Sequence, residues 1–189
     1  MGAPDLKIVR FIRRHHVMTL ATCRGGQPWC ANVFYAYIPD HNLFVFTSDV
    51  STRHGREAAD NARVSASIVL ETRVVGRVQG LQIEGRLELT VPKQACVDAN
   101  AAEEIDEVAG RGLPSEKNGR VAKFSTEYHE IGGEGEGVEL AAAARRAYLK
   151  RFPYAAVAEL ELWVLRPTRM KLTDNTLGFG KKLHWERQE

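Results

Sequence analysis

Six residues within one short stretch of the sequence carry the side-chain types that bind a phosphate group. They are Thr47, Ser48, Ser51, Thr52, Arg53 and His54. Hydroxyl groups donate hydrogen bonds to phosphate oxygens, and a guanidinium adds a charged, two-pronged partner. From 43 to 61 the pattern changes from an apolar strand to a helix, so these residues fall where a helix begins, with unpaired N–H groups and partial positive charge. The alternative is a structural turn, in which Ser51 caps the helix and Arg53 is solvated.

The charge of the chain is unevenly distributed. The net charge is +2, but residues 97–139 contain 11 acidic and 4 basic residues, which leaves the remainder at +9. A cationic body suits a small anionic ligand. It would also suit nucleic acid, but no basic stripe interleaved with aromatic residues is present, so we do not expect a nucleic-acid partner.

Length and composition indicate a single globular domain. The 189 residues are 44% hydrophobic, and no apolar run approaches the roughly 20 residues of a membrane span. The charged first residues do not resemble a signal peptide, so we expect a cytoplasmic protein without a membrane segment. Cys23, Cys30 and Cys96 form no CxxC pair, which predicts free thiols in a reducing compartment and no metal site.

The rest of the chain predicts a β-rich frame with flanking helices, the α+β class. Apolar periodicity predicts helices at 4–16, after the 47–54 turn, and at 140–152. It predicts strands at 17–23, 28–38, 43–47, 63–71, 78–91 and 158–165, the last resuming past Pro167 at 168–175. The first three strands have hairpin spacing, so they form an antiparallel meander.

The strand at 28–38 is apolar on both faces, interrupted by Asn32. An antiparallel strand with one wet face would alternate, so something must cover its second face. A partner subunit, a flat ligand or a helix of the same chain would each do so. Asn32 in that setting needs hydrogen-bond partners, from the backbone or from a ligand.

Two further segments stand apart from this frame. Residues 92–139 indicate an acidic insertion, with a short helix at 93–109 and a mobile Gly/Glu-rich stretch at 130–139. We interpret it as a solvated surface insertion, and the alternative is an anionic flap over the cationic site. In the basic and aromatic last segment, Lys181, Lys182 and Trp185 either contact a phosphate or stack on a ring, or the lysines are solvated and Trp185 packs.

The order of these elements resembles the pyridoxamine 5′-phosphate oxidase-like split-barrel family, and most of all its short bacterial YhbP-like branch. The segments that carry the resemblance are WCANVFY (29–35), TRH (52–54), RRAYLKRFP (145–153) and TDNTLGFGKK (173–182). The resemblance implies a six-stranded antiparallel split β-barrel spanning 1–189, which forms a homodimer with FMN at the interface. Deazaflavin and haem are alternative cofactors.

The resemblance also implies roles for residues. The FMN phosphate would contact Thr47, Ser48, Ser51, Arg53 and His54. The ring would lie near the strand that carries Asn32, and Lys181 and Trp185 would cover it from either subunit. The residues with which the oxidases hold their substrate's own phosphate have no counterpart here, so substrate and catalytic residues are not assigned. The implied function is a flavin-dependent oxidoreductase, and the alternative is a non-enzymatic cofactor-binding or sensing module.

Overall fold

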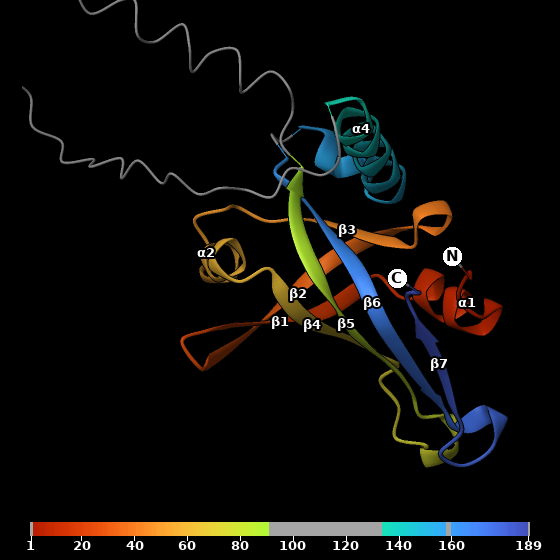
Figure 1. Ribbon diagram of the computed structural model, residues 1–189. Helices are drawn as coiled ribbons and strands as arrows, with labels where there is room; N and C mark the ends of the chain where they lie inside the picture. The colour runs from red at the N-terminus through yellow and green to blue at the C-terminus, as the bar shows by residue number, and fades with distance from the viewer. Residues whose placement is uncertain (1, 91–133, 158–159, 189) are drawn as a thin grey trace, which may run out of the picture.

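A computed structural model describes residues 2–90, 134–157 and 160–188 (Figure 1). Its strands are β1 (Val17–Arg24), β2 (Gln27–Ile38), β3 (Leu43–Thr47), β4 (Arg63–Val69), β5 (Gln79–Thr90), β6 (Leu162–Asp174) and β7 (Lys182–Glu186). Its α-helices are α1 (Leu6–Arg14), α2 (Arg53–Asp60) and α4 (Glu134–Arg151). Each predicted strand and helix within the described ranges is present, and β7 is an addition.

The strands form one antiparallel sheet that closes into a barrel. Their order is β3-β2-β1-β4-β5-β6-β7, and β3 also pairs with β6. Six strands therefore form a ring, which confirms the predicted split barrel. The pairing on β6 is divided, because Leu162–Leu165 pair with β3 whereas Arg169–Thr173 pair with β7. The seventh strand thus extends the far half of β6.

Strand β6 runs without interruption through Pro167, so the predicted continuation of the strand past this proline is confirmed. The pairing of β5 with β6 shifts register between Glu84 and Gly85, and Gly85 lies opposite Pro167. A proline lacks the N–H that a ladder needs and is tolerated where the ladder is irregular. A side chain at Gly85 would place its Cβ 2.5 Å from the carbonyl oxygen of Arg166, so glycine permits the close approach.

Two apolar clusters explain how the second face of β2 is covered. The barrel interior is filled by residues such as Tyr35, Phe44 and Phe46. Helix α4 packs on the outside against Ala36 and Ile38, so a helix of the same chain covers the C-terminal part of that face. The remaining part is open, and Phe34 on it keeps 48% of its surface exposed.

Helix α4 begins at Glu134, earlier than the predicted start at 140, so 134–139 belong to a helix rather than to a mobile stretch. The predicted helix at 93–109 and the Gly/Glu-rich residues before 134 lie outside the described residues, as does Cys96. Cys23 and Cys30 are free and exposed. Among the residues described, no helix combines the length and hydropathy that crossing a bilayer requires.

Candidate cofactor site

Helix α2 is capped by Thr52, whereas the alternative interpretation of the sequence placed Ser51 at the cap. Thr52 Oγ1 accepts a hydrogen bond from the N–H of Gly55 at 3.2 Å and donates to the carbonyl of Asp49 at 2.8 Å. Ser51 lies one residue earlier and is exposed. The first N–H groups of the helix, on Arg53 and His54, point out of its end, as at every helix N-terminus.

Ser48 joins the turn to the first residues of α2. Its hydroxyl lies 2.7 Å from Nε2 of His54 and 3.3 Å from the hydroxyl of Thr52. Burial lowers the pKa of His54 below its ordinary 6.5, and the carboxylate of Glu57 opposes this weakly. His54 is therefore a neutral imidazole at pH 7, and it exchanges a hydrogen bond with the Ser48 hydroxyl.

Arg53 is held in place by a buried carboxylate. Its Nε donates to Glu57 Oε1 at 2.7 Å, and Thr22 on β1 donates to Glu57 Oε2 at 2.6 Å. These hydrogen bonds, that from Thr22 first, lower the pKa of Glu57, which therefore stays ionised. The guanidinium also lies over the ring of Trp29, and 45% of the Arg53 side chain remains exposed. Arg53 is thus fixed at its Nε, with the outer part of the guanidinium accessible.

Two carboxylates already accept hydrogen bonds from backbone N–H groups of the turn. The N–H of Val50 donates to Glu161 Oε2 at 2.7 Å, and that of Ser51 donates to Asp49 Oδ1 at 2.6 Å. Thr47 Oγ1 donates to the carbonyl of Glu161 at 2.9 Å. A phosphate at this corner would therefore rely on the Arg53 guanidinium, the Ser48 hydroxyl and the first amides of α2, rather than on the amides of the turn. The single hydroxyl hydrogen of Thr52 is already donated to the carbonyl of Asp49.

The edge of β2 next to this turn is unpaired. Strand β3 pairs with β2 along Tyr35–Ile38, and no described strand pairs with the same edge from Gln27 to Phe34. The backbone N–H of Tyr35 donates to the carbonyl of His16, on the side of β2 that faces β1, at 2.9 Å. Backbone groups alternate sides along a strand, so those of Phe34 and Asn32 point toward the free edge. Hydrogen-bonding groups of β2 are therefore available beside the turn that carries Ser48.

The structure brings some of the predicted site residues together and separates others. Residues 47–54 form one corner, and β2 with Asn32 runs beside it, although the Asn32 side chain points to the opposite face and accepts from Thr19 Oγ1 at 2.8 Å. Lys182 pairs with Thr173 on β6, whereas Thr47 pairs with Leu162. Eleven residues of strand separate these points, roughly 35 Å. Lys181, Lys182 and Trp185 therefore lie away from the corner of their own chain.

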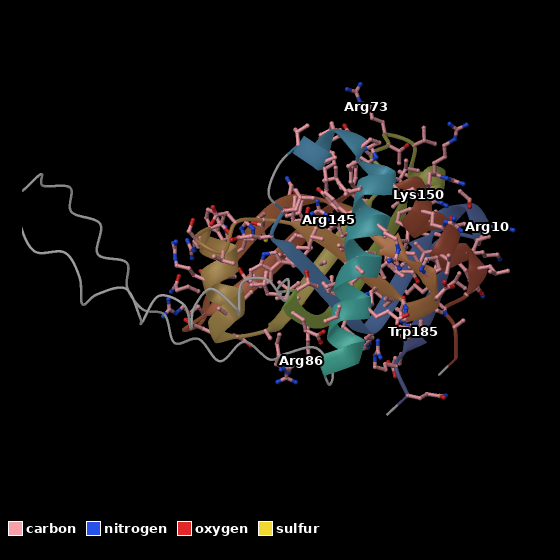
Figure 2. The ribbon with its side chains drawn as sticks, turned by 90° about the horizontal axis from the view of Figure 1, so that it is seen from above. Arg10, Arg73, Arg86, Arg145, Lys150 and Trp185 are labelled. Carbon is pink, nitrogen blue, oxygen red and sulfur yellow. The ribbon has the colours of Figure 1, made fainter. Side chains whose placement is uncertain are left out.

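Trp185 itself has a structural role. Its indole N–H donates to the carbonyl of Gly2 at 2.9 Å, and its ring packs against the barrel core. Figure 2 shows it at the end of the molecule opposite α2. The same separation of β7 from α2 is visible in Figure 1.

Sequence reasoning missed the groups that position Arg53. The spacing of Arg53 and Glu57, four residues apart in a helix, was a usable signal for that ion pair. Thr22, Trp29 and Glu161 reach the corner from distant parts of the chain, and short-range patterns carry no information about such contacts. Neither of the two described surface cavities includes residues 47–54.

The comparisons with known proteins agree with this architecture. The family model described as pyridoxamine 5′-phosphate oxidase matches residues 5–129, and the chain belongs to this family. A UPF0306 protein of Klebsiella pneumoniae is 31% identical over 180 residues, which cover 95% of this chain and 91% of that one.

Solved structures share the fold at low sequence identity. A haem-binding protein from Mycobacterium smegmatis matches 98% of this chain with a TM-score of 0.59 and 19% identity, and this chain spans 60% of its length. An FAD-binding protein from Mesorhizobium loti matches 88% of this chain and 90% of its own, with a TM-score of 0.54 and 14% identity. At sequence identities this low, the structural similarity shows a shared fold and nothing about function.

Proposed function

We propose that this protein binds FMN, with the phosphate at the 47–54 corner and the ring along the free edge of β2, and that it is a flavin-dependent oxidoreductase. The observation that carries the proposal is the accessible guanidinium of Arg53, fixed through Glu57 at a helix N-terminus beside an unpaired strand edge. An anion and a flat hydrogen-bonding ring would each find complementary groups there.

The residues at the corner fit a phosphate. Arg53 offers a charged donor, Ser48 offers a hydroxyl, and the first amides of α2 carry the positive end of the helix dipole. Ser51 is exposed, and its hydroxyl hydrogen-bonds to the Asp49 carboxylate, so it would contact the anion only by giving up that partner. The carboxylates of Asp49 and Glu161 limit the negative charge that the corner accepts, which favours a single phosphate group over a polyphosphate.

We propose a homodimer in which the partner completes the site. Lys181, Lys182 and Trp185 lie too far from the corner of their own chain, so any contact they make with the cofactor would come from the partner subunit. The exposed Phe34, and Trp29 with 42% of its surface exposed, leave apolar surface beside the free edge for the ring or the partner to cover.

FMN, when bound, would supply the electron or hydride transfer. The chain would bind the phosphate, orient the ring on β2 and exclude water, and we assign no residue as a catalytic base. In keeping with this role, we propose that residues 1–189 act as one domain, with 92–139 as its acidic insertion. The reduced thiols of Cys23 and Cys30 suit a cytoplasmic location.

A second candidate function is a sensing or storage module without turnover. The haem-binding and FAD-binding proteins with this fold support it, since they bind different flat cofactors. Haem and deazaflavin are thus alternatives to FMN.

The test is an absorption spectrum of the freshly purified protein, followed by FMN titration and assays with reduced nicotinamide cofactors. Flavin bands with turnover support an oxidoreductase, and flavin bands without turnover support the module. A haem Soret band, or colourless protein that binds no FMN, would contradict the proposal.

A further inference from the structure

The hydroxyl of Ser48 lies between two other side chains of the corner and has a single hydrogen to donate. Its oxygen is 2.7 Å from Nε2 of His54 and 3.3 Å from the hydroxyl of Thr52. Thr52 donates its own hydrogen to the carbonyl of Asp49. The direction of the Ser48 hydrogen therefore decides whether this hydroxyl can donate to a phosphate.

The position of Ser48 itself is set by its backbone. The carbonyl of Ser48 accepts the indole N–H of Trp163 at 2.8 Å, and its N–H donates to the carbonyl of Glu161 at 3.2 Å. Both partners lie at the start of β6, so two bonds from a neighbouring strand hold Ser48 at the corner. The hydroxyl hydrogen can turn, whereas the backbone is fixed.

Nε2 of His54 determines where that hydrogen points. When Nε2 carries no hydrogen, it accepts the hydrogen of Ser48, which then presents only lone pairs to an anion. When Nε2 carries a hydrogen, it donates to the Ser48 oxygen and leaves the Ser48 hydrogen free for a phosphate oxygen. Nδ1 of His54 has no hydrogen-bond partner in the part of the chain that the structure describes, so no neighbour fixes the state of the ring.

The charges around His54 leave its imidazole neutral in the free protein. Burial lowers its pKa, and the carboxylate of Glu57 on the same helix opposes this weakly. That carboxylate is already paired with Arg53, and those of Asp49 and Glu161 accept hydrogen bonds from amides of the turn. None of these groups hydrogen-bonds to the imidazole and holds a proton on it.

A phosphate bound to Ser48 changes this balance. Two hydrogen bonds in series, from His54 to Ser48 and from Ser48 to a phosphate oxygen, place the anion about 5 Å from the imidazole. An opposite charge within about 4–6 Å favours the charged form of a titratable group. The anion therefore favours an imidazolium, whose Nε2 always carries a hydrogen.

We propose that His54 is a positioning residue that couples FMN binding to proton uptake, because a protonated Nε2 releases the Ser48 hydroxyl to donate to the phosphate. This inference rests on the proposed FMN site and adds to it a control by pH. The proton comes from the solvent and adds to the imidazole, and no bond of FMN is formed or broken.

The test is isothermal titration calorimetry of the full chain with FMN at pH 6.5, in two buffers of different ionisation enthalpy. The difference in heat gives the number of protons taken up, which should be roughly half a proton or more for the wild type. Riboflavin, which lacks the phosphate, should bind without this uptake. The affinity of the wild type for FMN should also increase by at least about threefold from pH 8 to pH 6.5.

Two variants separate the coupling from binding itself. In His54→Gln the amide can donate to Ser48 but cannot take up a proton, so FMN should bind with nearly the wild-type affinity at pH 8 and without the gain at pH 6.5. Ser48→Ala keeps His54 and removes the hydroxyl, so FMN should bind about tenfold more weakly and with little proton uptake. Melting temperatures at pH 8 establish that the variants fold, and if His54→Gln does not, Ser48→Ala and riboflavin still decide the outcome.

Proton uptake that is equal in the wild type and in His54→Gln or Ser48→Ala would overturn the inference, as would equal uptake with riboflavin. In each of these cases FMN still binds, so the proposed function stands. If FMN binds to none of the three proteins, the proposed function fails and this inference fails with it.

Discussion

The guanidinium carbon of Arg53 lies 4.4 Å from the centroid of the Trp29 ring. This contact joins the first residue of α2 to the unpaired edge of β2. A cation over an indole face is attracted by the ring quadrupole, by about 0.5–1 kcal/mol at an exposed site. The contact therefore helps to set the position of the proposed phosphate ligand relative to the strand proposed to carry the flavin ring.

Arg53→Ala should weaken FMN binding by about 1.5–3 kcal/mol, the scale of a charged hydrogen bond. That corresponds to a rise in Kd of roughly 10–150-fold. Fluorescence titration measures it, with Arg145→Ala on the exposed face of α4 as the control (Figure 2). An unchanged Kd in Arg53→Ala would remove this residue from the site.

Thr22→Val should lower stability and loosen Arg53. Valine has the shape of threonine but leaves Glu57 Oε2 without its 2.6 Å hydrogen bond. The melting temperature should fall by a few degrees, the effect of one lost buried hydrogen bond in a chain of this length. Thr168→Val, which removes a longer bond of an exposed hydroxyl, serves as the control. Equal melting temperatures for the two variants would show that Thr22 does not support the ion pair.

Gly55→Ala should distort the turn. The added Cβ would lie 2.8 Å from the carbonyl oxygen of Val50 and 3.0 Å from that of Asp49. Alanine is favoured over glycine in a helix by about 1 kcal/mol, but crowding against backbone costs about 1–3 kcal/mol. We expect lower stability and weaker FMN binding. Gly76→Ala, where the new Cβ meets open space, should leave FMN binding unchanged. A Gly55→Ala protein that binds FMN normally would argue against a rigid corner.

The stability of the protein should decrease as the pH falls below 6.5, partly because of His54. Burial lowers its pKa in the folded state, so the unfolded chain takes up the proton first and is favoured below 6.5. Above that pH His54 is neutral in both states and contributes no pH dependence. His54→Gln should therefore lose less stability than the wild type between pH 6.5 and the lowered folded pKa, as urea unfolding would measure. Identical pH profiles for His54→Gln and the wild type would contradict the assignment.

Local patterns predicted the barrel well because they depend on residues near in sequence. Alternation over 79–90 and the hairpin spacing of the first strands determine which faces are buried, and the structure follows them. Strand β7 was not predicted, because Lys182–Glu186 is short and directly follows a glycine-containing segment. It forms because β6 extends far enough beyond β3 to offer a second pairing edge.

The candidate site was less predictable. The cluster of hydroxyls, Arg53 and His54 is local and could be found from spacing. The electrostatics of the site depend on Glu161, which accepts a hydrogen bond from Val50, 111 residues away in the sequence. No local sequence pattern predicts a contact over that separation. The position of Lys182 relative to the corner likewise depends on strand order, which only the folded chain determines.

The most direct test of the account compares FMN with riboflavin, which has the same ring without the phosphate, on the wild-type protein. If the 47–54 corner holds the phosphate, FMN should bind at least about tenfold more tightly than riboflavin, and Arg53→Ala should remove most of that difference. Equal affinities for the two flavins in the wild type would contradict the account.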